Sequence, residues 1–198
     1  MPLSTSFSEQ LARSHGSDNA IEAILLANIP GAVAVHKSHK TNDRKGTDFW
    51  VELSSGTHLS VDVKVRAEDW SAKEEPDAAD DLALETWSVV EQRKIGWTRD
   101  ETKRTEYVLW YWQDTGRWCL LPFPMLCHVF RQNWQTWSQQ YDTHQQFTRE
   151  YGGYHSECVF VPREVVWDQI YWAYNPTVKQ TASRRQVQDW INRDTRTP

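Results

Sequence analysis

Two aspartates and a lysine, Asp48, Asp62 and Lys64, have the types and spacing that metal-assisted chemistry requires. Carboxylate oxygens suit hard cations such as Mg²⁺, which often bind one or two carboxylates and complete their shell with water and phosphate oxygens. The carbonyl of Val63 could be a third ligand. A lysine two residues after Asp62 can reach the same place, where it orients or acidifies a water and offsets phosphate charge. These residues predict hydrolysis of a phosphodiester bond beside a bound metal.

A two-stranded hairpin is expected to position these side chains. Residues 59–66 alternate between apolar and polar side chains, which is typical of a strand with one buried face, and residues 49–53 continue the same parity. The turn between them ends at Gly56, which can take a positive φ. If the loop has three residues, Asp48 lies opposite Asp62 with Cβ atoms about 5 Å apart. Another turn would shift the register by one residue. Two carboxylates that close repel each other unless a cation lies between them.

The acid-x-Lys triplet is a weak signal by itself, because it occurs three times. Only the copy at Asp62-Val-Lys64 lies within an alternating apolar strand; the other two, at residues 43–45 and 101–103, lie in polar segments. An ordinary ion pair on a solvated strand face is the alternative interpretation.

The arrangement resembles the PD-(D/E)xK nuclease superfamily. Its motif is an Asp at the start of one strand, followed on the next strand by Asp or Glu, any residue and Lys. Residues 17–66 carry the resemblance, since an expected helix at 17–28 and a strand at 32–36 precede the hairpin, as the α-β-β-β core requires. One departure is Thr47, which stands where the motif has Pro. The resemblance implies a restriction-endonuclease-like α/β fold and an Mg²⁺- or Mn²⁺-dependent nuclease that acts on DNA.

The resemblance also implies further site residues. Many members add a Glu from the first helix, for which Glu22 is the candidate; a solvated first-turn Glu is the alternative. Glu85 is a further acid whose distance from Asp62 the sequence does not fix. Four basic residues lie in or beside the loop that leads into Asp48, where they suit contacts with a phosphate backbone or simply a solvated loop. They are Lys37, Lys40, Arg44 and Lys45.

Length and composition indicate a single α/β domain over residues 1–198. We expect a core at about 17–121 with a mixed sheet, and a helix-and-strand extension at about 122–198. The expected strands are 82–90, 107–112, 118–121 and 157–161, and the expected helices are 125–140 and 163–174. The acidic loop at 67–81 is interpreted as a mobile flap beside the site.

The composition of the 198 residues, 39% hydrophobic and 25% charged, is that of a globular protein. We expect it to be cytoplasmic, because it has no apolar run long enough for a bilayer and no signal-peptide pattern. The spacing of the three cysteines suggests buried free thiols. The net charge of −5 argues against strong nonspecific DNA binding, although the distribution of charge matters more than the sum.

Two other functions remain open. The chain could be a noncatalytic protein- or nucleic-acid-binding factor on a nuclease-like fold, such as a phage or defence-system regulator. With either function, it could form a homodimer or bind a protein partner. The hairpin could also be a structural element of an unrelated α/β fold. Most of the twelve tryptophans are expected in the core, while some could stack on unwound bases.

Overall fold

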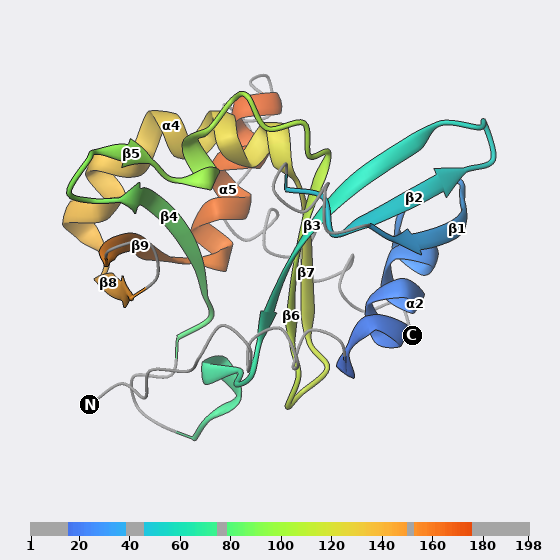
Figure 1. The fold of residues 1–198 in the computed structure, drawn as a ribbon, viewed down its shortest axis with the longest axis horizontal. Coiled ribbons are helices and arrows are strands. Elements are labelled where there is room, and N and C mark those ends of the chain that lie inside the picture. Colours follow the sequence, from blue (N-terminus) through green and yellow to red (C-terminus); the bar gives the residue numbers. More distant parts are fainter. Residues whose placement is uncertain (1–15, 39–45, 75–78, 150–152, 176–198) are drawn as a thin grey trace. The chain divides into compact units, whose positions relative to one another are not determined.

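The computed structural model describes residues 16–38, 46–74, 79–149 and 153–175 (Figure 1). These residues form two β-sheets and three α-helices, which confirms the mixed α/β class. The chain divides into two compact units. The first contains Met1–Asp80 and Asp100–Cys127, and the second contains Asp81–Arg99 and His128–Pro198.

The sheet of the first unit has five strands in the order β1-β2-β3-β6-β7. β3 lies at its centre, where it pairs antiparallel with β2 and parallel with β6, so the sheet is mixed, as predicted. The strands are β1 (Ala32–Lys37), β2 (Phe49–Leu53), β3 (His58–Arg66), β6 (Tyr107–Trp112) and β7 (Trp118–Pro122).

Helix α2 (Asp18–Asn28) packs on one face of this sheet (Figure 1). Ile21 and Leu25 recur at helical spacing and are fully buried against apolar strand residues such as Val51 and Val61. The odd-numbered residues of β3 belong to this core, so the even-numbered ones project from the opposite face. The apolar alternation thus sets which face of β3 carries Asp62 and Lys64.

The turn between β2 and β3 is the predicted three-residue loop. The Leu53 N–H donates to the Thr57 carbonyl at 2.8 Å, and Gly56 has a φ of 80°. This turn fixes the register in which Phe49 faces Val61. Gly56 supplies the left-handed conformation that an L-residue adopts only with strain.

The second unit has a four-stranded sheet in the order β5-β4-β9-β8. Its strands are β4 (Asp81–Val89), β5 (Lys94–Ile95), β8 (Thr143–Thr148) and β9 (Tyr154–Pro162). Helix α4 (Phe123–Gln140) begins in the first unit and continues in the second, which also contains α5 (Arg163–Tyr174). The structure differs here from the expected core at 17–121, because β4 pairs with β9 of the C-terminal segment. Alternation identifies a strand but does not identify a partner so distant in the sequence.

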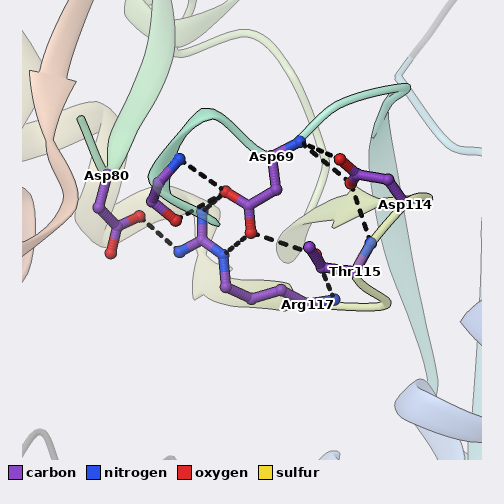
Figure 2. Close-up of polar contacts among 6 residues, drawn as sticks. Asp69, Asp80, Asp114, Thr115 and Arg117 are labelled. Carbon is purple, nitrogen blue, oxygen red and sulfur yellow. Dashed lines mark hydrogen bonds and ion pairs between the residues drawn. The ribbon is translucent and has the colours of Figure 1, made fainter. Parts of the chain in front are cut away.

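The acidic loop after β3 is anchored at both of its described ends. Asp69 is buried and accepts hydrogen bonds from Ser71 at the start of the 3₁₀ helix η1 (Trp70–Ala72). Its carboxylate also pairs with Arg117, whose guanidinium reaches Asp80 at the far end of the loop (Figure 2). Asp114 accepts two hydrogen bonds from the Asp69 N–H. The described ends of this segment therefore do not fit the predicted mobile flap, because a buried ion pair fixes them to the β6–β7 turn.

Two further expectations concerned buried free thiols and the absence of a membrane span. Cys119 and Cys127 are buried free thiols, as predicted, while Cys158 is half-buried. Burial, together with the nearby Asp100 charge, raises the pKa of Cys127 to about 11. None of the helices in the described ranges is both long and apolar enough to cross a bilayer.

We predict that Asp69→Asn lowers the free energy of unfolding at pH 7 by about 2–4 kcal/mol, because it leaves a partly buried guanidinium without its main counter-charge. The hydrogen bonds from Arg117 hold the pKa of Asp69 below its usual value despite burial. The stabilisation is therefore present above about pH 4, the pKa of Asp69 in the unfolded state. It is lost as the pH falls through the lower pKa that Asp69 has in the folded state. Urea denaturation at pH 7 and at lower pH measures both effects.

Asp80→Asn is the matched control, since it removes a more exposed partner of the same arginine. We expect it to cost less than about 1 kcal/mol. Equal losses in the two variants would contradict the central role of Asp69.

Candidate active site

The strand register brings Asp48 and Asp62 together. The register of β2 and β3 ends with Phe49 paired to Val61, and the Asp48 N–H donates to the same Val61 carbonyl at 2.9 Å, which leaves Asp48 beside Asp62. The Val63 N–H donates to Asp48 Oδ2 at 2.6 Å, and the Asp62 charge acts on the Asp48 carboxyl. Asp62 is 4% exposed, so the pair lies in a largely desolvated position at the start of β2.

The environment of Asp48 opposes its negative charge. Burial and the neighbouring Asp62 charge raise its pKa to about 7, against the weaker opposing effects of the Val63 N–H and the Lys64 ammonium. A carboxyl group with this pKa is partly protonated at neutral pH. A divalent cation would stabilise the ionised form, because it places positive charge beside both acids.

Lys64 forms a close ion pair with Asp62. Its Nζ lies 2.9 Å from both Asp62 oxygens, and its side chain is half-buried. Burial by itself would lower the pKa of Lys64, but the adjacent Asp62 carboxylate outweighs it and raises the pKa. The side chain is therefore an ammonium at neutral pH, which can donate hydrogen bonds and balance negative charge but cannot accept a proton.

The Val63 carbonyl lies on the same edge of β3 as the contacts to Asp48. The Val61 carbonyl accepts the Asp48 N–H at 2.9 Å, and the Val63 N–H reaches the Asp48 carboxylate. Peptide groups of alternate residues point to the same edge of a strand, so the Val63 carbonyl faces this edge too. Two carboxylates and a carbonyl suit a hard cation that keeps part of its water shell. Within the described ranges, no group of three or more His, Cys, Asp or Glu side chains gathers at one point.

Of the four basic residues predicted to bind nucleic acid, one lies among the described residues. Lys40, Arg44 and Lys45 lie outside the described residues. The Ser38 N–H donates to the Asp48 carbonyl at 2.7 Å. Lys37 is described, and its Nζ forms an ion pair with Asp18 of α2 at 2.5 Å.

The other two candidate acids lie on different elements from Asp48 and Asp62. Glu22 lies on α2, which packs on the face of the sheet opposite Asp62, and it forms no hydrogen bond or ion pair with another described residue. Glu85 belongs to the second unit, where its carboxylate accepts the Trp97 N–H at 2.8 Å.

Sequence reasoning missed several contacts of the polar face of β3 and of the segment before Asp48. The Glu106 carboxylate accepts hydrogen bonds from the N–H and the hydroxyl of Ser60, which shares the polar face of β3 with Asp62. Thr105 donates to the Gly46 carbonyl at 2.6 Å, and a Cβ at Gly46 would lie 2.8 Å from Lys103 Nζ. These contacts join segments far apart in the sequence through the parallel pairing of β3 and β6, for which no local pattern exists.

Comparisons with protein-family models, curated proteins and solved structures find no match to this chain.

We predict that Asp48→Asn stabilises the metal-free protein at pH 8 and has little effect near pH 4. The pKa of Asp48 is higher in the folded state, at about 7, than in the unfolded state, at 3.8. Its contribution to stability is therefore fully present below pH 3.8 and is lost as the pH rises through about 7. A difference of that size corresponds to about 4 kcal/mol once the group is ionised. Chemical denaturation in EDTA across this pH range measures the change.

Glu52→Gln serves as the control, because Glu52 lies on the same strand with a more exposed side chain. We expect it to change the free energy of unfolding by less than about 0.5 kcal/mol at either pH. A destabilised Asp48→Asn variant at pH 8 would refute the conclusion that the two carboxylates repel each other.

Proposed function

We propose that this protein is a metal-dependent nuclease that hydrolyses phosphodiester bonds in DNA. The observation that carries the proposal is the pair formed by the half-buried Asp48 and the buried Asp62, with the Lys64 ammonium 2.9 Å from Asp62. A structural strand pair gains little from two facing acids, whereas a cation-binding site requires them. DNA as substrate rests on the resemblance of these residues to the PD-(D/E)xK motif.

In this proposal each residue of the set has one role. Asp48, Asp62 and the Val63 carbonyl hold Mg²⁺ or Mn²⁺, which supplies Lewis-acid stabilisation of negative charge on the phosphate and the leaving oxygen. Lys64 orients the attacking water and donates to a phosphate oxygen, because its raised pKa keeps it charged. Burial of Asp62 excludes bulk water and strengthens these interactions.

The order of the elements around the pair supports the finer fold assignment. Helix α2 is followed by β1, β2 and β3, the α-β-β-β order that a restriction-endonuclease-like core implies. Asp48 precedes the first residue of β2, and Asp62 and Lys64 lie within β3, as in the motif.

A noncatalytic binding factor is the second candidate function, and one observation favours it. Lys64 already contacts both Asp62 oxygens, so this ion pair would account for the two residues without any substrate. It leaves Asp48 unexplained, because burial and the Asp62 charge raise the pKa of that carboxyl and the ion pair does not relieve the repulsion. The two candidates differ in what they predict for metal binding and for cleavage.

Incubation with plasmid and single-stranded DNA tests the activity directly. We expect cleavage with Mg²⁺ or Mn²⁺ and none with EDTA. Asp62→Ala and Lys64→Ala should each lose at least about a thousandfold in rate, since each removes a group that contacts the reacting phosphate or its metal. A wild-type protein that cuts neither DNA form with either metal would favour the binding factor.

Glu22→Gln tests whether the acid on α2 takes part in catalysis at this site. Because α2 packs on the opposite face of the sheet, we expect this variant to retain activity within about threefold of wild type. A loss as large as that of Asp62→Ala would place Glu22 in the catalytic set.

Metal binding can be measured without catalysis. We expect Mg²⁺ to raise the melting temperature of the wild type at pH 8, because a ligand of the folded state stabilises by about RT ln(1 + [L]/Kd). Asp48→Asn should lose the Mg²⁺ response, whereas Glu52→Gln should keep it. The same shift in all three proteins would place the cation elsewhere.

A further inference from the structure

Strand β8 forms one edge of the four-stranded sheet in the second unit (Figure 1). Within the described ranges its strand neighbour is β9, with which it pairs over six residues without a register shift. Every residue of β8 except Thr148 is exposed, so neither face of the strand is covered. The strand is therefore held in place by its pairing with β9, and its outer edge is accessible to another strand.

The two edges of this sheet differ in how well they resist pairing with another chain. Exposed edge strands are commonly protected by short length, charged residues, prolines or bulges. At the opposite edge, β5 has two residues, one of them a lysine, and its pairing with β4 is irregular. β8 is six residues long, pairs regularly, and contains no Asp, Glu, Lys, Arg or Pro. It therefore lacks the features that keep an edge strand from pairing.

The hydrogen bonds with β9 determine which residues of β8 face the outer edge. The Phe160 N–H donates to the Asp142 carbonyl at 2.9 Å, and these two residues have the same register as the strand pair. Because hydrogen-bonded and non-hydrogen-bonded pairs alternate in an antiparallel ladder, the even-numbered residues of β8 bond to β9. The carbonyl of His155, opposite Phe147, instead accepts the Val90 N–H, in agreement with this alternation. The residues whose N–H and C=O groups point outward are thus Thr143, Gln145 and Phe147.

These outward groups allow β8 to pair with a copy of itself. In an antiparallel pair with a two-fold axis at Gln145, each outward residue exchanges hydrogen bonds with one in the other copy, about six bonds in all. Gln145 then lies opposite its own copy, and Thr143 lies opposite Phe147. Phe147 is 55% exposed, so this pairing would cover part of its ring. No facing pair in this register contains two like charges.

The charges beside β8 favour the antiparallel orientation. Asp142 precedes the strand and Arg149 follows it, and both residues are exposed. Antiparallel pairing of two copies places the Asp142 end of one strand against the Arg149 end of the other, so opposite charges meet at both ends. A parallel pair would bring like charges together. The charge pattern is therefore complementary to that of a second copy in the antiparallel orientation.

We propose that a second copy of this chain pairs with β8 through antiparallel β8–β8 hydrogen bonds, which join the two four-stranded sheets into one continuous sheet. Main-chain hydrogen bonds between edge strands are a common mode of association. This inference concerns the second unit and does not rest on the proposed function. A single pair of strands is a small interface, so we expect a reversible dimer with a Kd of about 1–100 μM.

Sedimentation velocity of the full-length protein at about 1–300 μM tests the dimer. We expect a reversible monomer–dimer equilibrium for the wild type. Gln145→Pro should weaken the dimer at least about tenfold, because proline lacks the outward N–H and cannot donate to the facing strand. Gln145→Thr is the matched control, since it also loses the side-chain hydrogen bond to Glu157 but keeps the backbone N–H. It should dimerise within about threefold of the wild type.

Cross-linking tests the register. Gln145→Cys should form an intermolecular disulfide under mild oxidation, because residues that face each other in a hydrogen-bonded pair have Cα atoms about 5.5 Å apart. Gln146→Cys is the control, since in this register the two copies of residue 146 lie about 8 Å apart, beyond the reach of a disulfide. The wild type shows the background from its native cysteines.

A wild type that stays monomeric over the whole concentration range would overturn the inference. Equal dimerisation of Gln145→Pro and Gln145→Thr would also overturn it, because the dimer would then use another surface. Equal cross-linking at positions 145 and 146 would exclude the two-fold axis at Gln145. Far-UV circular dichroism shows whether Gln145→Pro is folded; if it is not, the two cysteine variants decide the outcome.

Discussion

The candidate site depends on the register between β2 and β3, which the turn at Gly56 sets. A slip of one residue would move the polar face of β3 into the core and separate Asp48 from Asp62. The same register buries Val51 and Val61 under α2, so the packing of the first unit and the placement of the acids are fixed together. Any function assigned to the carboxyl pair therefore depends on a local constraint at a single glycine with positive φ.

The carboxyl pair is an unfavourable arrangement in the absence of a cation. The buried Asp62 and the half-buried Asp48 repel each other once both ionise, and one nearby ammonium compensates only part of that cost. Apolar or amide side chains of similar size would stabilise the same hairpin better. The combination of Asp48, Asp62 and Lys64 is thus better explained by what it can bind than by what it contributes to stability.

Local patterns predicted most of the elements around the site. The alternation of β3, the apolar run of β6 and the proline before α5 each carry their own signal, and these elements lie where the sequence places them. The strand β8 was missed because it is exposed over nearly its whole length and therefore has no apolar periodicity. The partner of β4 was also missed, since residues far along the chain supply it.

Predictions about individual side chains were less complete for the same reason. Among the tryptophans expected in the core, Trp110, Trp112 and Trp137 are buried, whereas Trp134 is half-exposed. Its environment includes Arg99, which neither residue's local sequence indicates. Contacts between residues far apart in the sequence depend on how helices and strands pair, and a single sequence carries little information about pairing.

The negative net charge does not by itself argue against a nucleic-acid ligand, because many of the acids that produce it are engaged within the protein. Asp69 and Asp80 both pair with Arg117, Glu68 pairs with Lys73, and Glu85 accepts a backbone N–H. Their field is partly neutralised where it arises and is screened beyond about 8–10 Å in physiological salt. The response of the protein to a polyanion therefore depends on the local distribution of charge rather than on the sum.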